Sequence, residues 1–206
     1  MKKIFLLFVL LGVLIMSCQN KKVENQEETI KTEQQETKLV KIDVTEIPDN
    51  VVKLISQDWM LITSGNSNSF NTMTASWGFL GEIWGKHSSI IAVRDSRYTY
   101  EFLENNDTYT LSFFSEDYRD ALNICGTRSG RDTDKIKESG LTPKKMDSGL
   151  MSFEEARLII ECRKLYSEPF QRECFADKSI LEKIYDDETS MHTMYIGEIM
   201  NVWMKK

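Results

Sequence analysis

The 206-residue chain has little of what common catalytic and metal-binding motifs require. It holds two histidines, His87 and His192, and four cysteines without a CxxC pair, which argues against a histidine-rich metal site and a structural zinc site. It also lacks GxGxxG, P-loop, GxSxG and HExxH patterns. The sequence therefore offers no sign of a Rossmann dinucleotide site, a P-loop enzyme, an α/β-hydrolase or a zincin protease.

The chain also lacks an excess of positive charge. Lysine and arginine number 26 against 32 acidic residues, so the net charge is −6 and nucleic acid is not an expected partner. A long apolar run occurs once, from Ile4 to Met16, and nothing similar follows it. We therefore expect the folded part of the chain to be soluble and to touch a membrane only through an N-terminal anchor.

The N-terminus resembles a bacterial lipoprotein signal. Lys2 and Lys3 precede the apolar run, which fits a signal h-region and is too short to span a bilayer. Ser17 and Cys18 follow, in the pattern of a lipobox. We expect residues 1–17 to be a cleaved signal peptide and Cys18 to be lipidated, which predicts a membrane-anchored protein of the cell envelope. A plain secretory signal or an uncleaved anchor is the alternative.

Residues 18–46 are rich in Gln, Glu, Lys, Asn and Thr and contain no aromatic residue. Such a segment buries too little apolar surface to offset chain entropy, so we predict a disordered tether there. Residues 47–206 remain as one domain of ordinary size. Besides Cys18, the cysteines are Cys125, Cys162 and Cys174, an odd number that permits at most one internal bridge. Because Cys162 sits in an apolar run, we favour no disulfide.

Periodicity predicts six or seven strands with short helices between them. The expected strands are 59–63, 70–78, 88–93, 109–114 and 195–204, and 156–166 suits either a strand or a helix. The expected helices are 49–57, 100–105, 116–124 closed by Gly126, 131–138 closed by Gly140, and 178–185. The elements do not alternate as βαβ units. This order favours a mostly β, antiparallel barrel with α insertions.

Three stretches are unusual for plain structure. Residues 71–78 combine an amide, three hydroxyls and a tryptophan, which suits a ligand with a polar tail and a planar head, although a half-exposed strand explains them too. Residues 94–99 place arginine and hydroxyls at a strand-to-helix junction, which suits a phosphate or a simple helix cap. Residues 126–135 combine two glycines with three cations, in a ligand-binding loop or an ordinary surface loop.

Taken together, these stretches resemble the flavin reductase-like, FMN-binding split-barrel family, and within it the flavoredoxin-type branch. The resemblance lies in NTMTASWG (71–78), RYTYEF (97–102), SGRDTDK (129–135) and HTMYIGE (192–198), in the same order and spacing. It covers the chain from about Trp59 onward. No single motif is specific, but the set is.

The resemblance implies an antiparallel split β-barrel, a homodimer, and FMN in a cleft at the dimer interface. Asn71, Thr72, Met73, Thr74 and Ser76 would line the flavin, and Trp77 would lie near its ring. Arg97, Tyr98 and Thr99 would hold the phosphate end. Lys135 would lie close to the cofactor and favour the anionic reduced flavin, while His192 would contact the cofactor or an electron donor, or simply be half-buried at a strand start.

The flavin would carry the chemistry, so we assign no catalytic acid or base. The resemblance therefore predicts an FMN-dependent oxidoreductase of flavin reductase or flavoredoxin type, or an electron carrier. A redox-silent protein that stores flavin, and a degenerate barrel that only binds another envelope protein, are the alternatives. An envelope location favours a carrier over an NAD(P)H:flavin reductase, because reduced nicotinamide is a cytosolic pool.

Overall fold

A computed structural model describes residues 38–185 and 190–206 of the chain. Within these residues the strands are β1 (Leu39–Ile42), β2 (Met60–Asn66), β3 (Ser69–Ala75), β4 (Gly78–Ile83), β5 (Lys86–Arg94), β6 (Thr108–Phe113), β7 (Pro143–Lys145), β8 (Met151–Phe153), β9 (Leu158–Pro169) and β10 (His192–Lys205). The longer helices are α2 (Tyr98–Asn105), α3 (Arg119–Thr127), α4 (Lys135–Ser139) and α5 (Ser179–Ile184). Short helical turns are η1 (Val44–Glu46), α1 (Val51–Lys53), η2 (Leu54–Asp58), η3 (Glu116–Tyr118) and η4 (Arg172–Cys174).

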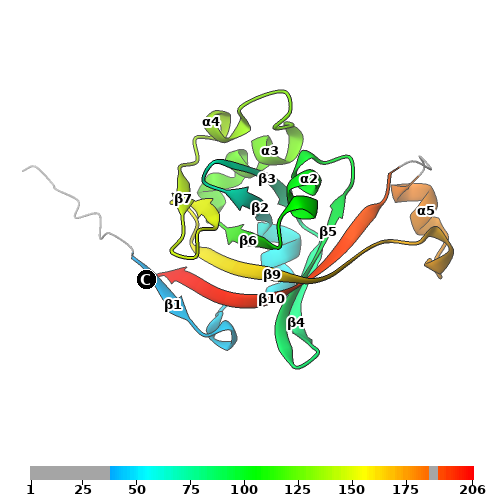
Figure 1. The fold of residues 1–206 in the computed structure, drawn as a ribbon, viewed down its shortest axis with the longest axis horizontal. Helices are drawn as coiled ribbons and strands as arrows, with labels where there is room; N and C mark the ends of the chain where they lie inside the picture. Colours follow the sequence, from blue (N-terminus) through cyan, green and yellow to red (C-terminus); the bar gives the residue numbers. More distant parts are fainter. Residues whose placement is uncertain (1–37, 186–189) are drawn as a thin grey trace, which may run out of the picture. The chain divides into compact units, whose positions relative to one another are not determined.

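One antiparallel sheet forms the body of the domain (Figure 1). Its hydrogen-bonded order is β3-β2-β6-β9-β10-β5-β4, with β1 added on β10 and a separate β7–β8 pair. The two ends of this order, β3 and β4, are consecutive in the chain and are joined through Ser76 and Trp77. The predicted mostly β, antiparallel architecture is therefore confirmed, and the sheet is left open between β3 and β4 in the described part of the chain.

Alternation along the strands separates two apolar layers. On β2, Met60 and Ile62 face the barrel interior, whereas Leu61 faces the layer formed by α3, α4 and the β7–β8 region. On β9, Ile160 and Ile159 divide in the same way. Because both faces of the central strands are buried, their sequences read as continuous apolar runs, which is why residues 156–166 suited a helix equally well.

Local packing and capping explain the shift of two predicted helix boundaries. Gly126 does not end a helix, because α3 continues to Thr127, and a Cβ on Gly126 would lie 3.2 Å from the Thr74 side chain. The absence of a side chain at Gly126 therefore lets α3 pack closely against Thr74 of β3. The helix predicted over 131–138 begins only at Lys135, because Asp134 caps it by accepting the Lys137 N–H. Gly140 ends that helix in a left-handed conformation, as predicted.

Four strands were not predicted, and one of them corrects the domain boundary. The tether expected over residues 18–46 is folded from Leu39 onward, since β1 pairs with the last residues of β10, from Leu39 opposite Lys205 to Ile42 opposite Val202. The next turn, η1, is closed by a capping box between Asp43 and Glu46. The expected signal peptide, Cys18 and the rest of the expected tether lie outside the described residues. The other unpredicted strands, β4, β7 and β8, are short.

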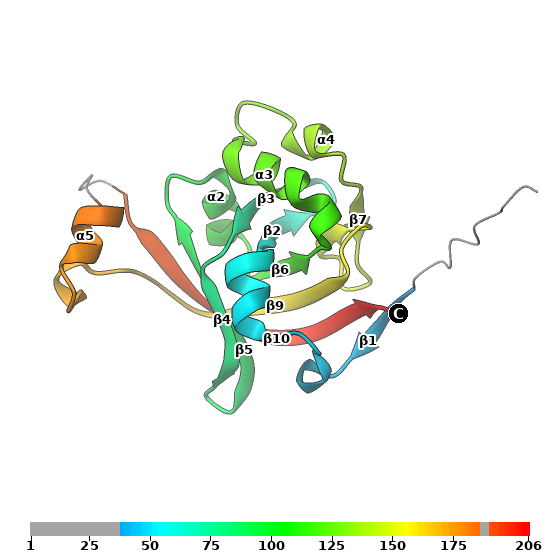
Figure 2. The ribbon, with the colours of Figure 1, turned by 180° about the vertical axis from the view of Figure 1, so that it is seen from behind.

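Strand β10 extends beyond the barrel at its N-terminal end. There it pairs with the outer half of β9, and the connection between the two strands carries η4 and α5 (Figures 1 and 2). Both views place β1 and α5 at opposite ends of β10. Among the described residues, no helix is long and apolar enough to cross a membrane. Cys125, Cys162 and Cys174 are all free thiols, and the first two are buried.

Close packing inside the barrel predicts a specific glycine requirement. A Cβ on Gly197 would lie 2.3 Å from the hydroxyl of Tyr109, which is fully buried, whereas a Cβ on Gly81 meets nothing within 4 Å. We expect Gly197→Ala to lower the free energy of unfolding by about 1–3 kcal/mol through overpacking. Gly81→Ala, the matched control, should not lower it. Urea unfolding followed by fluorescence measures both, and equal stabilities for the two variants would contradict this account.

Candidate functional site

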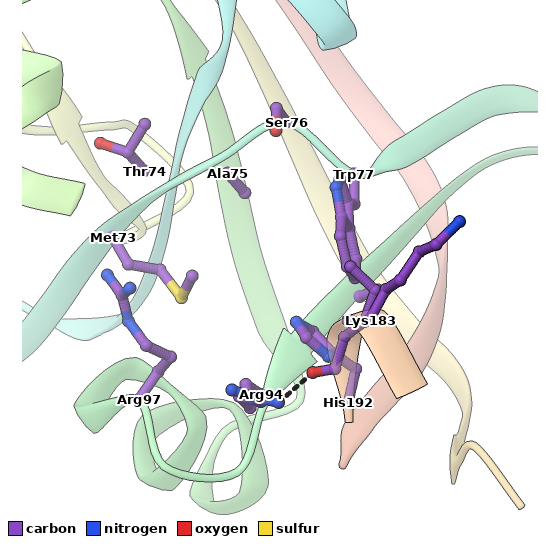
Figure 3. A pocket seen from close by; sticks show the side chains of 11 residues that line it. Met73, Thr74, Ala75, Ser76, Trp77, Arg94, Arg97, Lys183 and His192 are labelled. Atoms are coloured by element: carbon purple, nitrogen blue, oxygen red, sulfur yellow. Dashed lines mark hydrogen bonds between the residues drawn. The ribbon is translucent and has the colours of Figure 1, made fainter. Parts of the chain in front are cut away.

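A cavity of about 380 Å³ lies where the sheet is open (Figure 3). It is lined by Met73, Thr74, Ala75, Ser76, Trp77, Ala92, Arg94, Arg97, Lys183, Ile184 and His192. The end of β3 and the link to β4 form one wall. The other wall is formed by the C-terminal end of β5, by α5 and by the first residue of β10. The Arg97 side chain enters the cavity from the start of α2.

Arg97 is held at the N-terminal boundary of α2. Its Nη2 donates to the carbonyl oxygen of Gly126 at the end of α3, at 2.8 Å. Burial lowers the pKa of this guanidinium below its ordinary value. A cation fixed at a helix N-terminus, where unpaired backbone N–H groups also gather, is suited to an anionic group such as a phosphate.

A second cavity, of about 470 Å³, lies at the beginning of β3. Asn71, Tyr98 and the loop from Gly130 to Ile136 line it. The Asn71 side-chain amide donates to the Thr99 hydroxyl at 2.7 Å, which ties β3 to α2. A Cβ on Gly130 would lie 2.3 Å from Asn71 Oδ1, so only glycine lets the loop approach this strand so closely.

Lys135 is a buried cation at this second cavity. Lys135 is only 3% exposed. Its Nζ donates to the carbonyl oxygen of Arg128 at 3.5 Å, which is long for a hydrogen bond. Burial, with a smaller contribution from repulsion by Arg97, lowers the pKa of Lys135 to about 8. A buried, poorly satisfied ammonium is costly, and an anion bound beside it would remove that cost.

His192 and Trp77 stack at the outer wall of the first cavity. Their ring centroids are 4.7 Å apart and the planes are tilted by 34°. Burial, and then the charge of Arg94, lowers the pKa of His192 to about 4, so this histidine is neutral at physiological pH. Trp77 remains 43% exposed, which leaves its ring accessible to a planar ligand.

The structure divides the predicted site residues into three groups. Met73, Thr74, Ser76, Trp77, Arg97 and His192 line the first cavity. Asn71, Tyr98 and Lys135 line the second. Thr72 and Thr99 line neither: Thr72 is fully buried and donates to the Ile62 carbonyl oxygen, and Thr99 accepts the Asn71 bond. The bonds of these two residues connect β3 to β2 and to α2 next to the cavities.

Sequence reasoning missed the wall formed by Arg94, Lys183 and Ile184. Arg94 donates to the Ile184 carbonyl oxygen at 2.7 Å, which fixes α5 against the end of β5 (Figure 3). Arg94 stood in a stretch that drew attention, but α5 carries no motif. No sequence signal therefore indicated that α5 reaches the cavity.

The chemistry of the first cavity fits a planar, anionic cofactor. Its described lining contains three cations, Arg94, Arg97 and Lys183, no carboxylate, and the exposed ring of Trp77. Its volume lies within the range of about 300–1,000 Å³ usual for small-molecule sites. Among the described residues, no group of three or more His, Cys, Asp or Glu side chains could hold a metal ion.

Sequence comparison agrees with this fit. The profile of the family described as "Flavin reductase like domain" matches residues 52–206. The chain belongs to the flavin reductase-like family. A search of curated proteins found no match.

Solved structures of this family share the fold. An FMN-binding domain of a flavin reductase-like enzyme from Shewanella baltica is 13% identical with a TM-score of 0.59, over 82% of this chain and 78% of that one. Flavoredoxin of Desulfovibrio vulgaris is 23% identical with a TM-score of 0.56, over 72% and 69%. Flavoredoxin from Methanosarcina acetivorans is 18% identical with a TM-score of 0.55, over 72% and 69%. At these identities the likeness establishes the split-barrel fold.

Proposed function

We propose that this protein is an FMN-dependent oxidoreductase of flavin reductase or flavoredoxin type that passes electrons through bound FMN. The observation that carries the proposal is the cavity at the opening of the barrel, where an exposed tryptophan stacked on a neutral histidine shares the lining with three cations, Arg94, Arg97 and Lys183. Structural neighbours with this fold include proteins described as FMN-binding, as flavoredoxins and as flavin reductases.

In this proposal the chain binds and orients the flavin, which supplies the redox chemistry. Trp77 packs near the ring system, and Thr74 and Ser76 line its polar edge. Arg97 holds the phosphate, and Lys135 adds positive charge behind it. Because the described lining of the first cavity contains cations and no carboxylate, it favours the anionic reduced form and raises the reduction potential.

The deciding experiment is to purify the protein, identify its flavin, and measure FMN and riboflavin affinities for the wild type and Arg97→Gln. Loss of a charged hydrogen bond, worth about 1.5–3 kcal/mol, should weaken FMN binding about 10- to 100-fold and leave riboflavin binding unchanged. Lys144→Gln, on an ion pair with Glu154 in the β7–β8 region, is the control and should bind both normally.

Anaerobic reduction of the same sample separates a carrier from a storage protein. A carrier should accept and return electrons over repeated cycles with the flavin still bound. Release of the flavin on reduction would support storage instead. A protein that binds no flavin at all would overturn the proposal.

Lys135 predicts a pH dependence of FMN binding. Phosphate favours the protonated amine, and the pKa of about 8 in the free protein means that this charge is present below pH 8 and is lost above it. FMN affinity should therefore be highest near pH 7 and fall above pH 8, by at most about tenfold per pH unit. Lys135→Met should bind FMN more weakly and with a flat profile over this range. A flat wild-type profile would contradict the assignment.

We also propose that the protein is a homodimer whose interface includes the outer face of the sheet beside the first cavity. Strand register aligns Phe79, Ile90, Ile196 and Tyr166 in one row across β4, β5, β10 and β9. Phe79 is 69% exposed and Tyr166 43%. Two residues further along β5, on the same face, Ala92 lines the cavity, so an apolar surface and the flavin site adjoin.

The tip of the β4–β5 hairpin supports this interface. Trp84 and Gly85 form its turn with φ values of 56° and 68°, and Trp84 is 61% exposed. A tryptophan rarely occupies the left-handed region, and here the strain presents a large apolar ring next to Tyr166, with 6.5 Å between ring centroids. A surface of this kind is usually covered by a partner.

Sedimentation equilibrium tests the dimer. We expect the wild type to be dimeric and Phe79→Asp to dissociate and to lose FMN affinity, because a carboxylate cannot be buried unpaired in an apolar interface. Val52→Asp changes an equally exposed apolar residue, 75% exposed, on α1, and should remain a dimer with normal flavin content. A monomeric wild type that binds FMN would overturn the proposed interface.

We further propose that the protein is exported, lipidated at Cys18 and anchored in the cell envelope, with an envelope partner as its electron donor. The support is the residue pattern of the first 18 positions. Radiolabelled palmitate should be incorporated into the wild type expressed in a bacterial host and not into Cys18→Ser, which should leave the membrane fraction. Cytoplasmic, unlabelled wild-type protein would contradict this.

A further inference from the structure

Tyr185 forms a hydrogen bond with one ring nitrogen of His192, the histidine that lines the first cavity. Its hydroxyl lies 2.9 Å from His192 Nδ1, and the two rings meet edge-on with centroids 5.5 Å apart at 80°. Tyr185 is 2% exposed, at the end of α5, and its ring also packs against Phe175. This bond joins two segments that meet outside the barrel.

The position of the Tyr185 hydroxyl is set by two arginines. Arg94 donates to the Ile184 carbonyl oxygen, and its guanidinium lies 5.6 Å from the centroid of the Tyr185 ring. Arg172 donates to the Tyr185 carbonyl oxygen at 3.1 Å. The phenol is therefore fixed in place before any ligand arrives.

The charges around His192 decide which partner donates. Arg94 and Asp95 face it from the end of β5, Arg97 from the start of α2, and Lys183 and Tyr185 from α5. Burial and the arginines outweigh Asp95, so the ring is neutral. Burial also raises the pKa of Tyr185, so its hydroxyl keeps its proton. The phenol therefore donates to Nδ1, and the single ring proton of His192 resides on Nε2.

Nε2 has no hydrogen-bond partner among residues 38–185 and 190–206, and the ring that carries it lines the first cavity against Trp77. Figure 3 shows this ring between Trp77 and Arg94 at the cavity wall. We propose that Tyr185 is a positioning residue that fixes His192 as a neutral Nε2–H donor for a carbonyl oxygen of the molecule exchanging electrons with the flavin. This inference rests on the proposed function.

Nuclear magnetic resonance tests the geometry. The chain has two histidines, so ¹⁵N-histidine labelling of the FMN-loaded full chain gives two ring systems, and His192→Gln assigns them. We expect wild-type His192 to be the pure Nε2–H tautomer from pH 6 to pH 8. Tyr185→Phe should populate the Nδ1–H tautomer, whereas Tyr118→Phe, remote from the cavity, should leave the spectrum unchanged. A wild-type Nδ1–H tautomer, or an unchanged Tyr185→Phe spectrum, overturns the inference.

Kinetics tests the role. The anaerobically reduced FMN protein is mixed with duroquinone, a small uncharged dicarbonyl acceptor, and the half-saturating concentration is separated from the limiting rate. We expect Tyr185→Phe and His192→Phe to raise the half-saturating concentration threefold to tenfold, with the limiting rate within twofold of wild type. His192→Gln, which keeps an N–H donor, should recover part of the loss.

Equal half-saturation in all variants overturns the inference even when flavin binding is normal. A chain that binds no flavin is recognised by its absorbance spectrum and overturns the proposed function instead. The histidine tautomer is read independently of that absorbance, so the two failures are distinguishable.

Discussion

Hydrogen bonding along β10 connects one wall of the first cavity, the barrel and the N-terminal segment. One edge of the strand pairs with β9 over nearly its whole length, and the other pairs first with β5 and then with β1. Register shifts next to Gly197 and next to Asn201 let so long a strand bend around the barrel. The first residues of β10 therefore carry His192 to the cavity wall, while its last residues hold the N-terminal segment.

The proposed flavin site contains two cations, Arg97 and Lys135, whose charge does not stabilise the fold itself. Arg97 is half-buried and Lys135 is buried, and the first cavity has no carboxylate among its described lining residues to neutralise Arg97. Groups in such surroundings reduce the stability of the empty protein. An anionic cofactor reverses this cost, so stability and cofactor binding are linked through the same two side chains.

Much of this site could be read from the sequence because the motif residues lie on continuous elements. The polar run from Asn71 to Trp77 follows one strand and its exit, so all of its members except Thr72 reach the cavities without help from distant packing. Arg97 and Lys135 lie at the starts of α2 and α4, where a cation together with free backbone N–H groups can bind an anion. The side chains of Thr72 and Thr99 line neither cavity, because alternation and helix geometry turn them inward, toward bonds with neighbours that no motif reveals.

The remainder depends on contacts between distant segments. The α5 wall, the Tyr185–His192 bond and the row of apolar residues across four strands follow from strand register, which the sequence alone does not define. β1 was missed because four residues, Leu39–Ile42, in polar surroundings become a strand only when the end of β10 is available to pair with them. Because β1 is part of the sheet, the folded domain begins at Leu39 and not at the expected residue 47.

That short strand also shows where the N-terminal segment enters the domain. β10 has 14 residues, and at about 3.3 Å per residue it covers about 45 Å from His192 to the end paired with β1. In a chain held at a surface by its N-terminus, the anchored segment enters the domain at β1, and the flavin cavity is at the far end of the longest strand. Its redox partners would then bind at the end of the domain that is remote from the entering N-terminal segment.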